Sequence, residues 1–189
     1  PPHAAPPLSC PPAIYDAVGG LVSVPPCVVA GLGIDRKLKS RSYLGVQAQF
    51  LKSDVERQIG VFNFPVGSVP PPPPVTAGST AETLDYQEQS VAATVNQLVS
   101  EEWSVGTQYR FTHARLHTVF PEIPVASNPS ADTTQQADLH QLGLFALWNH
   151  RSGFFARADL QWYHQVNAGY APALLTEDFW QGNLWLGYR

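Results

Sequence analysis

The chain has 189 residues and a net charge of −4, and charged residues make up 14% of it. Soluble domains usually carry about 25% charged residues, so little charge is available to cover a surface. The slight negative charge provides no basic footprint, which excludes nucleic acid as a partner. No run approaches the roughly 18 apolar residues of a membrane helix, which excludes a helical membrane protein and leaves a membrane β-barrel possible.

The two ends of the chain and its two cysteines indicate how the chain is organised outside its regular strands. The chain contains no Met and stops at Arg189 within a strand-like pattern, so we expect a piece of a longer protein. Residues 1–26 are rich in proline, which blocks ladder hydrogen bonding and helix propagation, and we expect them to be irregular. Cys10 and Cys27 could close a short disulfide loop in an oxidising compartment, or they could be two unrelated thiols.

Alternation of apolar and polar residues with a period of two predicts β-strands over most of residues 27–189. In the first half, the expected strands in chain order are 27–38, 42–51 with a continuation to residue 62, and 86–99. The connection between the last two contains the consecutive prolines Pro70–Pro74, which favour an extended polyproline II segment. We expect a stiff piece of a long loop there, and a ligand for a proline-binding domain is the alternative.

The same pattern continues through the second half of the chain. The remaining expected strands, in chain order, are 103–112, 138–148, 154–163 and 178–189. The first of these follows the tight turn 100–102 and should form a hairpin with 86–99, with arms of roughly ten residues. The next is less regular, because Phe145 and Leu147 fall on its polar side. A tight turn precedes 154–163, and Gly153 can take a left-handed conformation there.

The strand at 154–163 shows the alternation most clearly. One side carries Phe154, Ala156, Ala158, Leu160 and Trp162, and the other carries Phe155, Arg157, Asp159, Gln161 and Tyr163. A helix would place Arg157 and Gln161 on the same stripe as Phe154, so only a period of two gives an apolar face. That apolar face could cover a protein core or contact lipid.

The connections between the expected strands alternate in length. Short turns are expected at 39–41, 100–102 and 149–152, and longer connections at about 60–82, 119–136 and 167–177. Hairpins reverse the chain each time, so the short turns should share one edge of an antiparallel meander, which is the layout of outer-membrane β-barrels. A soluble antiparallel sheet such as a sandwich explains the alternation equally well, but not the sorted connections or the low charge.

Aromatic and polar residues fit the same arrangement. Aromatic rings fall near both edges of the expected sheet, where the membrane interface would lie: Trp103, Trp148 and Phe154 near the short turns, and Trp162 and Trp180 toward the long loops. The opposite face would line a water-filled lumen, and its candidate lining residues are Glu88, Arg110, Arg157, Asp159 and Gln161. These polar residues could contact a plug or a passing solute.

No catalytic site, metal site or cofactor is expected. His113 and His117 share a face of a strand but stand roughly 13 Å apart at about 3.3 Å per residue, which does not suit a metal pair. Asp159, His164 and several serines supply the residue types of a hydrolase, yet the chain contains no GxSxG motif. Scattered polar residues on a wet face are the simpler interpretation.

Three stretches resemble a known family. VNQLVSEEWSVGTQYRFTHARLHTVFPEIP at 95–124, ADLHQLGLFALWNHRSGFFARADLQWYHQ at 137–165 and EDFWQGNLWLGYR at 177–189 resemble the C-terminal barrel region of TonB-dependent-receptor-like outer-membrane proteins. The likeness covers most of residues 27–189 and rests on the strand–turn–strand pattern. The family's TonB box, plug domain and aromatic-ended terminal strand are not in this chain.

The resemblance implies a part of a large barrel in the outer membrane of a Gram-negative-type bacterium. Such transporters have about 22 strands, of which roughly seven would be present here as a curved open sheet. It also implies uptake of a solute as a receptor or transporter, with a plug domain and a TonB-type energy-coupling protein as partners outside this chain. A passive outer-membrane pore and a soluble antiparallel β-sheet binding module are the alternatives.

Overall fold

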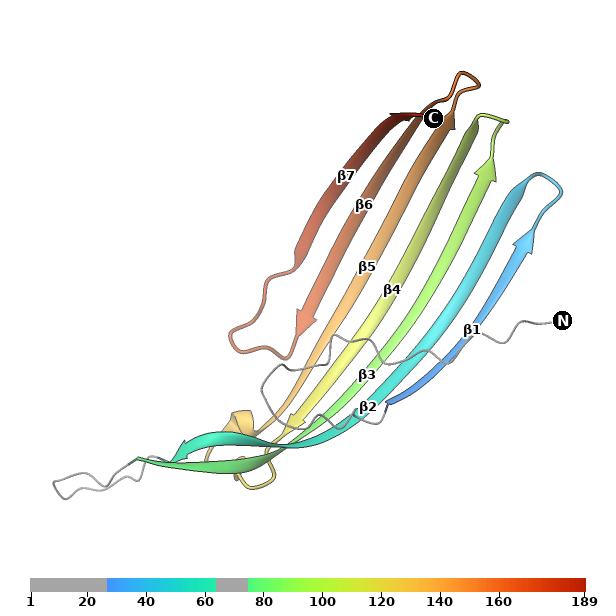
Figure 1. Ribbon diagram of the computed structural model, residues 1–189. Helices are drawn as coiled ribbons and strands as arrows, with labels where there is room; N and C mark the ends of the chain where they lie inside the picture. Colours follow the sequence, from blue (N-terminus) through green and yellow to red (C-terminus); the bar gives the residue numbers. More distant parts are fainter. Residues whose placement is uncertain (1–26, 64–74) are drawn as a thin grey trace.

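The computed structural model describes residues 27–63 and 75–189, and these residues form one curved sheet (Figure 1). Its seven strands are β1 (Cys27–Lys37), β2 (Ser42–Asn63), β3 (Thr76–Leu98), β4 (Trp103–Val119), β5 (Asp132–Asn149), β6 (Phe154–Ala168) and β7 (Glu177–Tyr188). Each strand pairs antiparallel with the next along the chain, and β1 and β7 are the free edges. The predicted all-β antiparallel meander of about seven strands is therefore confirmed.

The structure contains little besides strands. A short 3-10 helix, η2 (Pro129–Ala131), precedes β5, and the Asn128 side chain caps it by accepting a hydrogen bond from the Ser130 N–H. None of the described residues forms a helix that is long and apolar enough to cross a membrane. The expectations for residues 1–26 and for Pro70–Pro74 lie outside the described residues.

The hairpin arms of roughly ten residues were wrong, because the strands are much longer. β3 begins at Thr76, ten positions before the expected start, and Thr76 pairs with Asn63 at the far end of β2. The early part of β3 is rich in Thr, Ala and Ser, so it lacks the apolar alternation that marks a strand. Its ladder is supplied by β2, and such long-range pairing can override a weak local pattern.

The connections are sorted by length as expected. The short turns 38–41, 99–102 and 150–153 all lie at the edge of the sheet that is uppermost in Figure 1. The longer connections 120–131 and 169–176 lie at the opposite edge, where β2 ends at Asn63 and β3 begins at Thr76. Gly153 has a φ of 99°, which confirms the left-handed glycine predicted for the turn between β5 and β6. Below, the two edges are called the short-turn edge and the long-loop edge.

The register assigns every strand residue to one of two faces, since directly paired residues of an antiparallel sheet point to the same side. On one face, one row of paired residues runs Leu44, Val95, Thr107, Leu144, Leu160 and Gly182. On the other face, one row runs Gln47, Ala92, Arg110, Gln141, Tyr163 and Phe179. We call these the apolar face and the polar face.

Burial on the two faces is the reverse of that in a water-soluble sheet. The buried strand residues all belong to the polar face: Leu51, Ser53, Thr80, Glu82, Ser90 and Ala92. On the apolar face Leu32 is 69% exposed and Leu186 is 73% exposed. Side chains crowd on the concave side of a curved sheet and splay on its convex side, so we infer that the polar face is concave.

The described residues form no second layer over the apolar face. Each strand contacts its sequence neighbours in the sheet, and η2 contacts β5. Large side chains of every strand remain exposed on this face, among them Val28, Val46, Val91, Tyr109, Leu144, Leu160 and Leu184. An exposed apolar surface this extensive is typical of a face that interacts with another protein or with a membrane.

Candidate functional site

Aromatic rings border the apolar face at its short-turn edge. Trp103 on β4 and Trp148 on β5 are direct register partners, and their rings stack with centroids 6.1 Å apart. Phe154 on β6 meets Tyr188 on β7 edge to face, with centroids 4.9 Å apart. The three aromatic residues expected near the short turns therefore lie in two adjacent rows at this edge, with Tyr188 beside Phe154 in the second.

A second aromatic row lies toward the long-loop edge, where polar groups first join the apolar face. Trp162 and Trp180 are register partners with ring centroids 6.2 Å apart. In the next row His140 Nδ1 lies 2.7 Å from the hydroxyl of Tyr109, and His164 stacks on Trp162 with centroids 5.7 Å apart. From Phe154 to Trp162 the apolar stretch of β6 is about 26 Å long, at about 3.3 Å per residue.

The five polar residues expected to line a lumen all lie on the polar face, but the structure does not bring them into one site. The carboxylate of Glu88 accepts a hydrogen bond from the Tyr86 hydroxyl at 2.7 Å. Arg157 and Asp159 pair with each other near the short-turn edge. Arg110 and Gln161 share a hollow at the centre of the sheet.

Arg157 is held in place by its neighbours on the polar face. Its Nε lies 2.9 Å from Asp159 Oδ2, and its Nη2 lies 3.0 Å from Asp159 Oδ1. The guanidinium also lies over two rings, with its Cζ 5.9 Å from the Phe145 centroid and 5.6 Å from that of Trp185. The apolar Phe145 that broke the predicted alternation therefore packs against a cation on the polar face.

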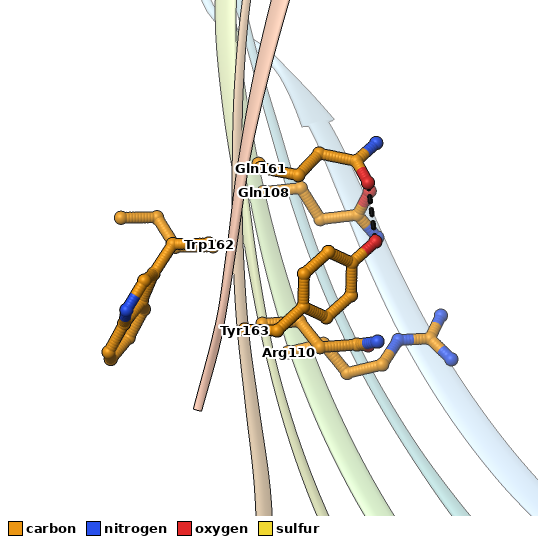
Figure 2. A pocket seen from close by; sticks show the side chains of 8 residues that line it. Gln108, Arg110, Gln161, Trp162 and Tyr163 are labelled. Carbon is orange, nitrogen blue, oxygen red and sulfur yellow. Dashed lines mark hydrogen bonds between the residues drawn. The ribbon is translucent and has the colours of Figure 1, made fainter. Parts of the chain in front are cut away.

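The central hollow has a volume of about 240 Å³ and is lined mainly by amide side chains. Gln108 and Arg110 come from β4, Gln141 from β5, and Gln161 and Tyr163 from β6. Figure 2 shows Gln108, Arg110, Gln161 and Tyr163 on one side of the sheet, with the Tyr163 hydroxyl donating a hydrogen bond to Gln161 Oε1. Trp162, which is also at this position, points away from them to the apolar side.

Arg110 differs from Arg157 in having no charged partner. It forms no ion pair or side-chain hydrogen bond with any residue in the described part of the chain. Its side chain extends to the same side of the sheet as Gln108, Gln161 and Tyr163 (Figure 2). Half-buried and unpaired, it retains five N–H donors for a ligand or for water.

The histidines and acids of the described residues lie in separate pairs rather than in one cluster. His113 Nδ1 lies 2.6 Å from Asp138 Oδ1, while His117 Nε2 lies 2.8 Å from Asp132 Oδ1, so each histidine has its own carboxylate. Among the described residues, no group of three or more His, Cys, Asp or Glu side chains could hold a metal ion. Asp159 and His164 lie on opposite faces of β6 and cannot act together.

Cys27 is disulfide-bonded at the start of β1. The other cysteine of the chain, Cys10, lies outside the described residues. Cys27 faces the same side of the sheet as Ser53, its partner in the register, and therefore belongs to the polar face.

Several residues that contact the candidate lining residues were not picked out as site residues from the sequence. Gln108, Gln141, Tyr163 and Trp185 give no local signal that separates them from other residues on a wet side. They meet because the register aligns Arg110 with Gln141 and Gln141 with Tyr163, on three successive strands. A pairing register depends on turn geometry and on the packing of both faces, and a period-two pattern does not specify it.

Comparison with known proteins identifies no family. No family model, curated protein or solved structure matches the chain. The resemblance to TonB-dependent-receptor-like proteins remains a prediction, and the function has to be argued from the two faces of the sheet.

Proposed function

We propose that the sheet is part of the wall of an outer-membrane β-barrel that takes up a small polar solute. In this proposal the apolar face contacts lipid and the polar face lines a water-filled lumen. The observation that carries it is the distribution of burial, with Val, Leu and aromatic side chains exposed on the apolar face while the buried strand residues, most of them polar, lie on the other face. This distribution suits a sheet with hydrocarbon outside and water inside.

The size and borders of the apolar face support lipid as its neighbour. A strand tilt of about 40° reduces the apolar stretch of β6 to a height of about 20 Å. The aromatic rows at both ends increase this height toward that of the apolar band of known membrane barrels, which is about 25 Å. Trp and Tyr prefer the two membrane interfaces, because their rings have an apolar body and a polar tip.

The free edges of β1 and β7 support a closed wall. Among the described residues no further strand pairs with either edge, and unpaired backbone N–H and C=O groups are costly in a bilayer because no water is present to bond them. Pairing with further strands would satisfy these groups and enclose the polar face as a lumen. The predicted barrel of about 22 strands would leave such a lumen wide enough to hold a plug.

Two features favour an uptake receptor over a passive pore. The β2–β3 hairpin continues from Lys52 to Asn63 past the apolar band, about 36 Å at about 3.3 Å per residue, and offers a wall on which a ligand could be captured. The hollow at Arg110 offers polar groups for binding inside the lumen. A plug domain and a TonB-type energy-coupling protein, which the resemblance implies, belong to this proposal.

Fractionation of cells that make the full-length protein tests the membrane location. We expect the protein to sediment with outer membranes, to resist extraction by salt, and to migrate faster in detergent gels before heating than after. A product in the aqueous phase whose migration does not change on heating would favour the soluble binding module. A steady open conductance of the purified protein in planar bilayers would instead favour the passive pore.

A further inference from the structure

We propose that the hollow around Arg110 is a binding site for a solute that carries both a carboxylate and hydroxyl groups, such as a sugar acid. The proposal deepens the uptake function and rests on it for its biological role. Two arginines of the polar face provide the starting observation: among the described residues, Arg157 near the short-turn edge pairs with a charged side chain, and Arg110 in the central hollow does not.

Arg157 is paired within the sheet and can be compared with Arg110. Asp159 binds it through both carboxylate oxygens, and the rings of Phe145 and Trp185 flank it. These contacts engage Nε and Nη2 and pair the charge of Arg157 with a carboxylate of the same strand. The same arrangement neutralises Asp159, which therefore does not repel an anion that approaches Arg110.

Arg110 has the same side chain without these partners. Its direct register neighbours on the polar face are Ala92 and Gln141, neither of which carries a charge. A guanidinium presents parallel N–H donors in a rigid fork that matches the two oxygens of a carboxylate. An unpaired arginine fixed in a hollow is therefore suited to a planar anion.

The rest of the hollow is suited to hydroxyl groups. Gln108, Gln141 and Gln161 each present an amide that can donate and accept, and the Tyr163 hydroxyl can do both as well. Sugar hydroxyls also donate and accept, so such amides can satisfy several of them at once. The volume of about 240 Å³ lies below the range of about 300–1,000 Å³ typical of drug-sized ligands, which indicates a single small ring.

An apolar surface beside the hollow completes the recognition of a ring. Tyr163 stacks on Phe179 of β7 with centroids 4.9 Å apart and ring planes 17° apart. The pair forms a flat aromatic platform on the polar face, against which the C–H side of a sugar ring can pack. The site thus combines one cation, several amides and one aromatic platform, contributed by four neighbouring strands.

Binding of glucuronate to the folded full-length protein tests the site, with glucose as the neutral probe and glucose 6-phosphate as an anion of different shape. We expect glucuronate to bind most tightly, and Arg110→Gln to weaken it by at least about tenfold through loss of a charge-assisted hydrogen bond. Arg115→Gln is the matched control, because Arg115 lies on the same strand but on the opposite face. It should leave glucuronate binding unchanged.

A second variant guards against misfolding. Gln141→Glu places a carboxylate directly opposite Arg110, so the protein should fold with a new ion pair and lose glucuronate binding. Equal binding of glucose and glucuronate, tighter binding of the phosphate, or unchanged binding in Arg110→Gln would overturn the carboxylate site. Heat-modifiable migration shows whether each variant is folded. If the protein fractionates as soluble, the same glucuronate titration is carried out in buffer. Failure of the membrane proposal can therefore be distinguished from failure of the binding site.

Discussion

The indole Nε1 of Trp162 donates a hydrogen bond to Asp178 Oδ1 at 2.7 Å, across the β6–β7 pair. The body of the same ring lies on the apolar face beside Trp180. Tryptophan suits such a boundary, because its ring is apolar and its N–H seeks a polar partner. This contact joins the apolar band to the first acidic group beyond it, and it marks where the proposed membrane interface lies on β6 and β7.

Replacing Trp162 by Phe should cost more stability than the same change at Trp180. Both residues keep an aromatic ring in the same register row, but only Trp162 loses a hydrogen bond, since the Trp180 indole bonds no residue in the described ranges. The difference should be about 0.5–1.5 kcal/mol. Urea unfolding of the two variants in lipid vesicles measures it, and equal costs would show that the hydrogen bond contributes nothing.

An arginine in the middle of the apolar face should prevent stable insertion. Leu160→Arg places a charge toward lipid and should destabilise the folded protein by about 2–4 kcal/mol. Gln161→Arg puts the same side chain one position further on, toward the proposed lumen, and should change stability by less than about 1 kcal/mol. The measurement is the folded fraction after refolding into vesicles. If both variants insert equally well, the apolar face does not contact lipid.

A methyl group at Gly106 should disturb the polar face. An added Cβ would collide with the Phe145 ring and with Asn96 Oδ1. Gly106→Ala should therefore cost about 1–3 kcal/mol, as overpacking usually does. Gly182→Ala is the control, because its nearest neighbour would be Leu160 Cδ1 at 3.9 Å, an ordinary contact. Thermal unfolding compares the two, and a neutral Gly106→Ala would mean that the ring moves aside at little cost.

The ion pairs between two short turns should matter little. Arg151 Nη2 lies 3.1 Å from Glu101 Oε2, and Arg151 Nε lies 3.7 Å from Glu102 Oε1, with the Arg151 side chain 80% exposed. Exposed pairs contribute about 0–1 kcal/mol, because water screens both charges. We expect the free energy of unfolding of Arg151→Gln, measured in urea, to lie within about 0.5 kcal/mol of that of the unmodified protein. A larger loss would indicate that this turn is packed against something else.

The alternating pattern predicted the strands well where both faces have a clear character. In β6 the apolar residues from Phe154 to Trp162 fall on one face and the residues between them on the other, as expected. The start of β3 was missed, because a run of Thr, Ala and Ser has no apolar side to reveal it. The paired ladder with β2 forms this segment, and a ladder depends on residues distant in the sequence.

The candidate site was predictable in type but not in arrangement. Arg110 and Arg157 could both be placed on the polar face from their positions in alternating strands. Their different surroundings could not be foreseen, because Trp185 reaches Arg157 from β7 while Gln141 faces Arg110 from β5. In both cases the contacting residue lies on a different strand from the arginine.

The sequence by itself determined that the chain forms an antiparallel meander with one apolar and one polar face, and that short turns share one edge. Both follow from local chemistry, since side chains alternate along a strand and each tight turn reverses the chain. The tertiary structure alone decided which residues of different strands meet, and it aligned Arg110 with Ala92 and Gln141, neither of which is charged. Strand register and sheet curvature set those contacts, and both arise from the cooperation of all seven strands.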